Sequence, residues 1–285
     1  MRSYISLTKP GIVFGNLITA AGGFGLGVHG SFDVVSFLAM LIGLSLVVGA
    51  SSVFNNYLDR DMDAKMERTK HRALVEGKIP LRHALTFGAS LMIIGVLVLL
   101  TWTNTLTTIV SLMWFLAYVI FYSLLWKRTY YGTHVGTLSG VVPPLAGYAA
   151  SAGVIDGASV ILFVILAIWQ LPHFYAIATY RLEDYKAARV PVLPAVRGIY
   201  VTKIQTTLHI VAYALASSLL TIFGYSGFTY LTTVGALSLW WLVVAFQGFS
   251  AIDNERWGRR MFKISLIVLT IQFAVLFAQG LVRLP

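Results

Sequence analysis

Long apolar runs separated by short polar segments dominate this chain. A helix needs roughly 20 mostly apolar residues to cross the hydrocarbon core of a bilayer. Nine runs approach or exceed that length, at about residues 11–29, 34–57, 84–103, 106–126, 133–152, 158–180, 204–224, 227–249 and 261–282. Helices are expected because backbone polar groups in lipid must be satisfied within their own segment. The pattern predicts an all-α integral membrane protein with about nine transmembrane helices in a single domain, residues 1–285.

Composition supports lipid as the solvent of this protein. Hydrophobic residues make up 58% of the 285 positions and charged residues only 11%, whereas an ordinary soluble domain has about 25% charged residues. The absence of cysteine excludes disulfides, thiolate nucleophiles and iron–sulfur clusters. The net charge of +10 has an explanation in the loops of a membrane protein, so no nucleic-acid partner is expected.

Basic residues fix the expected orientation. With nine spans, all of the 21 lysines and arginines except Arg283 lie on one side of the membrane. Because basic loops stay in the cytoplasm, the N-terminus is expected inside and the C-terminus outside. The two large cytoplasmic connections are near 58–83 and 181–203. Connections on the other side are very short, so any chemistry is expected at the cytoplasmic face.

Oxygen-bearing side chains recur at the cytoplasmic end of the second run. Asn55, Asp59 and Asp63 are spaced by four, so on a helix they form one stripe with about 6 Å between steps. Carboxylate and amide oxygens suit Mg²⁺, which commonly bridges protein carboxylates and substrate phosphates. The alternative is a solvated helix end whose charges pair with Arg60 and Lys65.

Cations and a second acidic group favour the metal site over that alternative. Arg68-Thr69-Lys70-His71-Arg72 follows the stripe and supplies groups suited to a diphosphate. Glu183 and Asp184, with Lys186 and Arg189, follow the sixth run on the same side. A bipartite site is therefore predicted, with metal ligands Asn55, Asp59, Asp63 and Asp184 and diphosphate contacts from Arg60, Arg68, Arg72 and Lys186.

Other polar residues near the membrane have two interpretations each. His173 lies within the sixth run, where an ionisable group is expensive and often functional, and histidine is also a common ligand of haem iron. It is otherwise a neutral imidazole bonded to a neighbouring helix, which is the interpretation favoured for His209. Tyr122 and Lys127, at the cytoplasmic end of the fourth run, are either diphosphate contacts or interfacial anchors. The Gly132–Gly147 stretch is expected to serve close helix packing.

Several motifs together resemble the UbiA superfamily of intramembrane prenyltransferases, and within it the protohaem IX farnesyltransferases (haem O synthases). The likeness extends from the first run to the ninth. It is carried by Asn55 to Asp63, Met66-Glu67-Arg68-Thr69, Thr8-Lys9-Pro10 with Asn16, Trp169 to Phe174, and Asp184-Tyr185-Lys186 followed by Val192-Leu193-Pro194.

This resemblance implies a ring of nine helices around a central cavity open to lipid, in the inner (plasma) membrane. It implies that Mg²⁺ holds a polyprenyl diphosphate between two aspartate-rich loops, and that Lys9 and Asn16 belong to the substrate site. The implied reaction joins farnesyl diphosphate, haem B and water to give haem O and diphosphate, with His173 near the porphyrin. Haem-copper oxidase assembly proteins are implied as partners.

The sequence departs from the family pattern at three positions. Ala73 stands where many members have proline, Arg189 where glycine is frequent, and Tyr180 where most have the first aspartate of the second motif. The second metal site is therefore expected to be poorer in carboxylate, with Tyr180, Glu183 or Lys186 compensating.

Two other functions are considered. A prenyltransferase for a quinone-precursor aromatic acid would share the first motif but would not need His173. A secondary transporter usually places polar residues at the bilayer midplane in broken helices, often within inverted repeats. Acidic groups at one face and an odd number of spans argue against a transporter.

Overall fold

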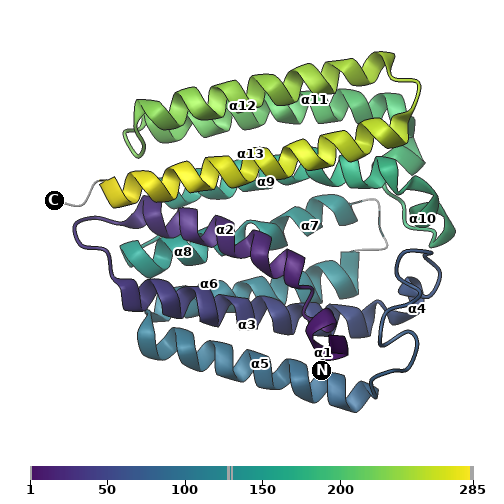
Figure 1. Ribbon diagram of the computed structural model, residues 1–285, viewed down its shortest axis with the longest axis horizontal. Coiled ribbons are helices and arrows are strands. Elements are labelled where there is room, and N and C mark those ends of the chain that lie inside the picture. Colours follow the sequence, from purple (N-terminus) through teal and green to yellow (C-terminus); the bar gives the residue numbers. More distant parts are fainter. Residues whose placement is uncertain (1, 127–128, 130, 283–285) are drawn as a thin grey trace.

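The computed structural model describes residues 2–126, 129 and 131–282, and its helices lie side by side along the long axis of the molecule (Figure 1). No strand occurs within these residues. The elements, in order, are α1 (Arg2–Leu7), α2 (Pro10–Gly27), α3 (Val34–Leu58), α4 (Arg60–Asp63), α5 (Leu81–Trp102), α6 (Thr105–Phe115), the π-helix η1 (Leu116–Trp126), α7 (Gly132–Gly140), α8 (Val142–Ala152), α9 (Gly157–Tyr180), α10 (Leu182–Ala187), α11 (Leu193–Ile222), α12 (Phe228–Gln247), the 3₁₀-helix η2 (Gly248–Ser250) and α13 (Asn254–Val282).

The predicted all-helical membrane architecture is confirmed. In the described part of the chain, eight helices are long and apolar enough to cross a membrane, counting α6 together with the first part of η1. The run predicted at 133–152 is divided between α7 and α8 at Val141. Each of these two helices is shorter than the roughly 20 residues needed to cross alone, so the fifth predicted span is an end-to-end pair of short helices.

Two predicted boundaries were wrong, because charged residues were assigned to loops. The helices that hold the spans predicted to start at 204 and 261 begin instead at Leu193, with a kink at Gly198 (φ 80°), and at Asn254. The predicted loop 181–203 is therefore mostly helical. Lys203 shows the reason, since it is buried within α11 with its ammonium 5.5 Å from the centre of the Trp257 ring. An aromatic face can hold a cation at such a position.

Glycines bring α2 into backbone contact with its neighbours. A Cβ added to Gly147 of α8 would overlap the carbonyl oxygen of Ala20, and one added to Gly280 of α13 would overlap that of Gly25. Within the glycine-rich stretch, Gly136 packs on the Tyr122 ring. Small residues allow this approach because packing rather than burial from water joins helices in lipid. The glycine-rich stretch is confirmed as a packing element.

The two acidic segments meet at one end of the bundle. In Figure 1, α4 and α10 lie at the same end as the N-terminus, after the ends of α3 and α9. A small buried cluster joins them, formed by Met62, Met66, Ala178, Val190 and Val192. Apolar contact between these segments fixes one acidic segment relative to the other and positions the site described next.

Candidate active site

The Asn55–Asp59–Asp63 stripe is continuous and buried. Although α3 ends at Leu58, the amide of Asp59 donates to the Asn55 carbonyl at 2.9 Å and that of Asp63 to the Asp59 carbonyl at 2.8 Å. Helical spacing is thus kept through α4. The three residues are only 2%, 3% and 5% exposed. The interpretation as a solvated helix end is wrong, since these groups face the protein interior.

Asn55 is the centre of a polar network. Its Nδ2 donates to Asp59 Oδ2 and to Ser123 Oγ, both at 2.8 Å. Its Oδ1 accepts from the ammonium of Lys9 and from the Tyr118 hydroxyl, the latter at 3.3 Å. All four hydrogen-bonding positions of this amide are therefore used. The network holds Asn55 and Asp59 side by side.

The two arginines nearest the stripe behave differently. Arg72 Nη1 lies 2.5 Å from Asp63 Oδ2, and both side chains are largely buried. Arg60 pairs with its exposed neighbour Asp61 at 3.1 Å. The structure therefore brings Arg72 to the acidic stripe and turns Arg60 toward Asp61.

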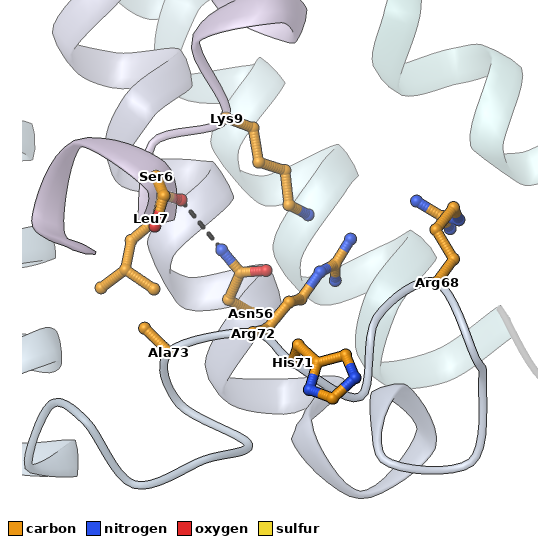
Figure 2. A pocket seen from close by; sticks show the side chains of 8 residues that line it. All are labelled: Ser6, Leu7, Lys9, Asn56, Arg68, His71, Arg72 and Ala73. Atoms are coloured by element: carbon orange, nitrogen blue, oxygen red, sulfur yellow. Dashed lines mark hydrogen bonds between the residues drawn. The ribbon is translucent and has the colours of Figure 1, made fainter. Parts of the chain in front are cut away.

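A cleft of about 260 Å³ opens beside the stripe, between α1 and the loop that follows α4. Figure 2 shows the side chains of Lys9, Arg68 and Arg72 projecting into one space. The cleft is lined by Ser6, Leu7, Lys9, Asn56, Arg68, His71, Arg72 and Ala73. Guanidinium and ammonium groups in this arrangement can bind a polyanion such as a diphosphate.

Ion pairs on the outer side of this loop neutralise other charges. Lys70 is 2.7 Å from Glu67, and its hydrogen bond lowers the pKa of the Glu67 carboxyl. Lys78 and His71 likewise donate to Glu76 and lower its pKa. These acids therefore stay ionised and bind Lys70 and Lys78. Arg68 has no ion-pair partner in the described part of the chain, which leaves its charge for the cleft.

The second acidic segment contains one half-buried acid and one exposed acid. Asp184 Oδ2 lies 3.9 Å from Arg181 Nη1, whereas Lys186 pairs with the exposed Glu183 at 2.9 Å. Tyr180 presents its ring to two guanidinium groups, Arg181 at 5.2 Å and Arg259 at 5.3 Å. Where the family pattern has an acid, this segment has an aromatic surface that holds cations.

The backbone conformation at Arg189 explains why glycine is favoured at this position. Its φ of 54° lies in the left-handed region, which glycine adopts without steric cost. Arg189→Gly should therefore raise the free energy of unfolding by roughly 0.5 kcal/mol, the relief of strain less the added freedom of the unfolded chain. Ala187→Gly, inside α10, should lower it by about the same amount. Thermal unfolding of both variants measures the two changes in stability. Changes of the same sign in both variants would contradict the prediction.

His173 lies in an aromatic layer between α9 and α13. Its Nδ1 is 2.7 Å from Ser265 Oγ, and its ring stacks on Trp169 with centroids 4.7 Å apart. Phe262 contacts the same ring at 5.1 Å. The bond to a neighbouring helix fits the structural interpretation and also orients the imidazole, so haem contact stays a prediction. The predicted bond of His209 to a neighbouring helix is wrong, since its imidazole bonds to the Gln205 carbonyl of its own helix at 2.7 Å.

The remaining predicted residues fall in different places. Tyr122 stacks on Tyr118 at 5.9 Å in η1, beside the Asn55 network. Asn16 donates to the Ile12 carbonyl one turn earlier in α2, at 2.9 Å. Lys127 lies outside the described residues.

Sequence analysis missed four polar partners of the site: Asn56, Tyr118, Ser123 and Ser265. A signal existed for two of them. Asn56 adjoins Asn55 in sequence, and Tyr118 precedes Tyr122 by one turn. Ser123 gave none, because it reaches the site through the wider turn of the π-helix, where its hydroxyl donates to the Tyr118 carbonyl five residues back at 2.8 Å.

The residues present fit a hard divalent cation. Asn55, Asp59 and Asp63 supply buried oxygens on one helical stripe, and basic side chains already contact two of them. Oxygen ligands with net negative charge are what Mg²⁺ prefers. No cluster of three or more histidine or acidic side chains able to hold a metal occurs among the described residues. Asp184 is thus placed at the same end of the bundle but in a separate ion pair.

Comparison with known proteins agrees with this geometry. The UbiA prenyltransferase family profile matches residues 16–267. Protoheme IX farnesyltransferase of Yersinia pseudotuberculosis is 46% identical over 271 residues, covering 95% of this chain and 92% of that protein. The enzyme of the same name from Pectobacterium atrosepticum is 47% identical over 272 residues, with the same coverage.

Solved structures share the fold at lower sequence identity. A digeranylgeranylglyceryl phosphate synthase superimposes with a TM-score of 0.78 at 20% identity, covering 98% of both chains. A UbiA homologue from Archaeoglobus fulgidus, bound to DMAPP and Mg²⁺, superimposes with a TM-score of 0.73 at 17% identity. The match covers 96% of this chain and 99% of that one. With its profile match over most of its length and its full-length relatives, this multi-pass membrane protein belongs to the UbiA prenyltransferase family.

Proposed function

We propose that this protein transfers the farnesyl group of farnesyl diphosphate to a vinyl group of haem B, with addition of water, and releases haem O and diphosphate. The observation that carries the proposal is the buried Asn55–Asp59–Asp63 stripe beside a cationic cleft. It occurs in a chain that is 46% identical, nearly end to end, to a protoheme IX farnesyltransferase.

The cleft favours departure of the diphosphate. Lys9, Arg68 and Arg72 stabilise the negative charge that grows on the leaving group as the allylic carbon–oxygen bond breaks. Asp59 and Asp63, with Asn55, would hold Mg²⁺, which neutralises the diphosphate further when bound. Burial of the stripe strengthens these interactions, because water no longer screens them.

The acceptor supplies the nucleophile in this reaction. A porphyrin vinyl group attacks the allylic carbon, and water captures the resulting cation as a hydroxyl group. No protein nucleophile is required, which agrees with the absence of cysteine. A site reached from lipid suits two substrates that dissolve poorly in water and shields the cation from premature hydrolysis.

The direct test is product analysis. Membranes containing the protein should convert haem B and farnesyl diphosphate to haem O, identified by its mass, and chelation of Mg²⁺ should stop the reaction. A quinone-precursor aromatic acid such as 4-hydroxybenzoate is the comparison acceptor. Farnesylation of that acid without conversion of haem B would favour the other prenyltransferase function.

His173 is assigned to the acceptor, since it lies in a membrane-embedded aromatic layer apart from the acidic stripe. His173→Ala should raise the KM for haem B about tenfold, the equivalent of one good hydrogen bond or ligand contact, and leave the KM for farnesyl diphosphate within about twofold. Steady-state kinetics with each substrate varied measures the split. The control is His209→Ala, because the imidazole of His209 hydrogen-bonds within α11 and meets the Tyr175 ring of α9 edge-on at 5.9 Å. The same KM for haem B in both variants would show that His173 only packs between helices.

The membrane orientation is part of the proposal. Basic residues at the end of the bundle that holds the site support a cytoplasmic N-terminus and active site. A reporter that is active only outside the cytoplasm should be active when fused after α13, and inactive in the loop between α4 and α5. The opposite pattern would reverse the proposed orientation.

A further inference from the structure

Two basic side chains bind the oxygen atoms that would coordinate the metal. The ammonium of Lys9 donates to Asn55 Oδ1, and the guanidinium of Arg72 lies 2.5 Å from Asp63 Oδ2. Both cations also line the cleft. Each therefore sits between a metal-binding oxygen on one side and the proposed diphosphate site on the other.

Asn56, which lines the same cleft, has a buried hydrogen-bond acceptor. Asn56 is 3% exposed, and its Nδ2 donates to the Leu7 carbonyl at 2.9 Å, as the dashed line in Figure 2 shows. Its Oδ1 is buried and has no hydrogen-bond partner in the described part of the chain. An unsatisfied buried carbonyl is destabilising, so a hydrogen bond from a donor that reaches it is favourable. Arg72 lines the cleft beside it.

We propose that Lys9 and Arg72 are resident counter-cations of the metal ligands and exchange partners when the metal binds. A divalent cation takes Asp63 and Asn55, Arg72 and Lys9 turn to the diphosphate in the cleft, and Asn56 Oδ1 accepts a hydrogen bond from the released guanidinium. The inference rests on the proposed metal–diphosphate function, which it deepens.

Electrostatics gives the exchange its direction. Without a metal, a buried Asp63 carboxylate needs a counter-charge, because an uncompensated buried charge is strongly destabilising. With a metal bound, Arg72 would face a like charge at Asp63 and an anion in the cleft, so the same guanidinium is more stable against the diphosphate. Pairing with Lys9 and Arg72 therefore weakens metal binding when no diphosphate is present. Once the metal is bound, the released cations strengthen diphosphate binding.

The first experiment measures binding of Mn²⁺, as a probe for Mg²⁺, by electron paramagnetic resonance on the full chain in nanodiscs. Without diphosphate, Arg72→Gln should tighten Mn²⁺ binding about tenfold, because the internal competitor is removed. With Mn²⁺ present, the same variant should bind farnesyl diphosphate about tenfold more weakly. Arg82→Gln, at an exposed arginine in the first turn of α5, is the matched control and should change neither affinity. Unchanged or weaker Mn²⁺ binding in Arg72→Gln would overturn the exchange.

A second experiment needs no variant. Phenylglyoxal modifies accessible guanidinium groups, and peptide mass analysis reports each arginine separately. Mn²⁺ alone should raise the modification rate of Arg72 at least about threefold, and farnesyl diphosphate with Mn²⁺ should then protect it. The rate at Arg82 should stay constant. No change at Arg72 on adding Mn²⁺ would overturn the exchange even if Arg72→Gln folds poorly.

A double-mutant cycle tests the acceptor. If Asn56 receives the released Arg72, the losses in diphosphate affinity of Asn56→Ala and Arg72→Gln should be less than additive. If Asn56 acts only through Leu7 and so positions Lys9, its loss should be additive with Arg72→Gln, which would overturn its role as acceptor. Wild-type protein that binds neither Mn²⁺ nor farnesyl diphosphate would instead overturn the proposed function itself.

Discussion

Asp59→Asn should lower turnover about 10³-fold or more while leaving the protein folded. The change keeps the size of the side chain and its ability to accept from Asn55 Nδ2, now 2.8 Å away, but removes the charge that would bind the metal. Loss of charge stabilisation at a reacting diphosphate costs several kcal/mol of barrier. Haem O formation per milligram of purified protein is the measurement, with thermal unfolding as the test of folding.

Asp61→Asn is the matched control for Asp59. Asp61 lies two residues further along the chain, is exposed, and pairs with Arg60 on the surface. Exposed pairs contribute little, so Asp61→Asn should keep nearly normal turnover. If Asp59→Asn also kept nearly normal, Mg²⁺-dependent turnover, the buried stripe would not be the metal site.

Asp184→Asn should lower turnover about 10- to 100-fold, a smaller loss typical of groups that support a metal site rather than dominate it. Its side chain is 17% exposed, and it lies 3.9 Å from Arg181. The buried cluster of Met62 with Val190 brings its segment against the first motif. Removing its charge should also raise the KM for farnesyl diphosphate, which steady-state kinetics at saturating haem B measures.

Glu183→Gln is the matched control for Asp184→Asn. It distinguishes a specific role of the Asp184 carboxylate from a general effect of negative charge in this segment. Glu183 is 84% exposed and pairs with Lys186. Glu183→Gln should therefore change turnover less than about threefold, since surface pairs contribute little. Equal losses in the two variants would show that both acids act only through the general field of the segment.

Periodic features of this protein could be predicted from its sequence. The spacing of Asn55, Asp59 and Asp63 placed them on one helical stripe, and their backbone hydrogen bonds confirm it. Apolar length predicted the spans, because lipid imposes a minimum on each. Glycine at Gly147 predicted close packing, which its overlap with the Ala20 carbonyl confirms.

Contacts between distant segments could not be predicted. Lys9 is 46 residues from its partner Asn55, and His173 is 92 residues from Ser265. Their pairing depends on how the helices pack, which no local pattern specifies. Burial of the stripe was also beyond the sequence, since acids at a helix end are usually solvated. Met62, next to Asp63, lies in a buried cluster with Val190 and Val192, which are more than 100 residues further along the chain.

The corner between α1 and α2 has a practical consequence for handling the protein. Leu7 is buried there and Lys9 enters the cleft two residues later, so any polypeptide joined ahead of α1 would emerge beside this cleft. The far end of α13 lies at the opposite end of the bundle (Figure 1). An affinity tag for purification therefore belongs after α13, where it can neither cover the cleft nor pull Lys9 away from it.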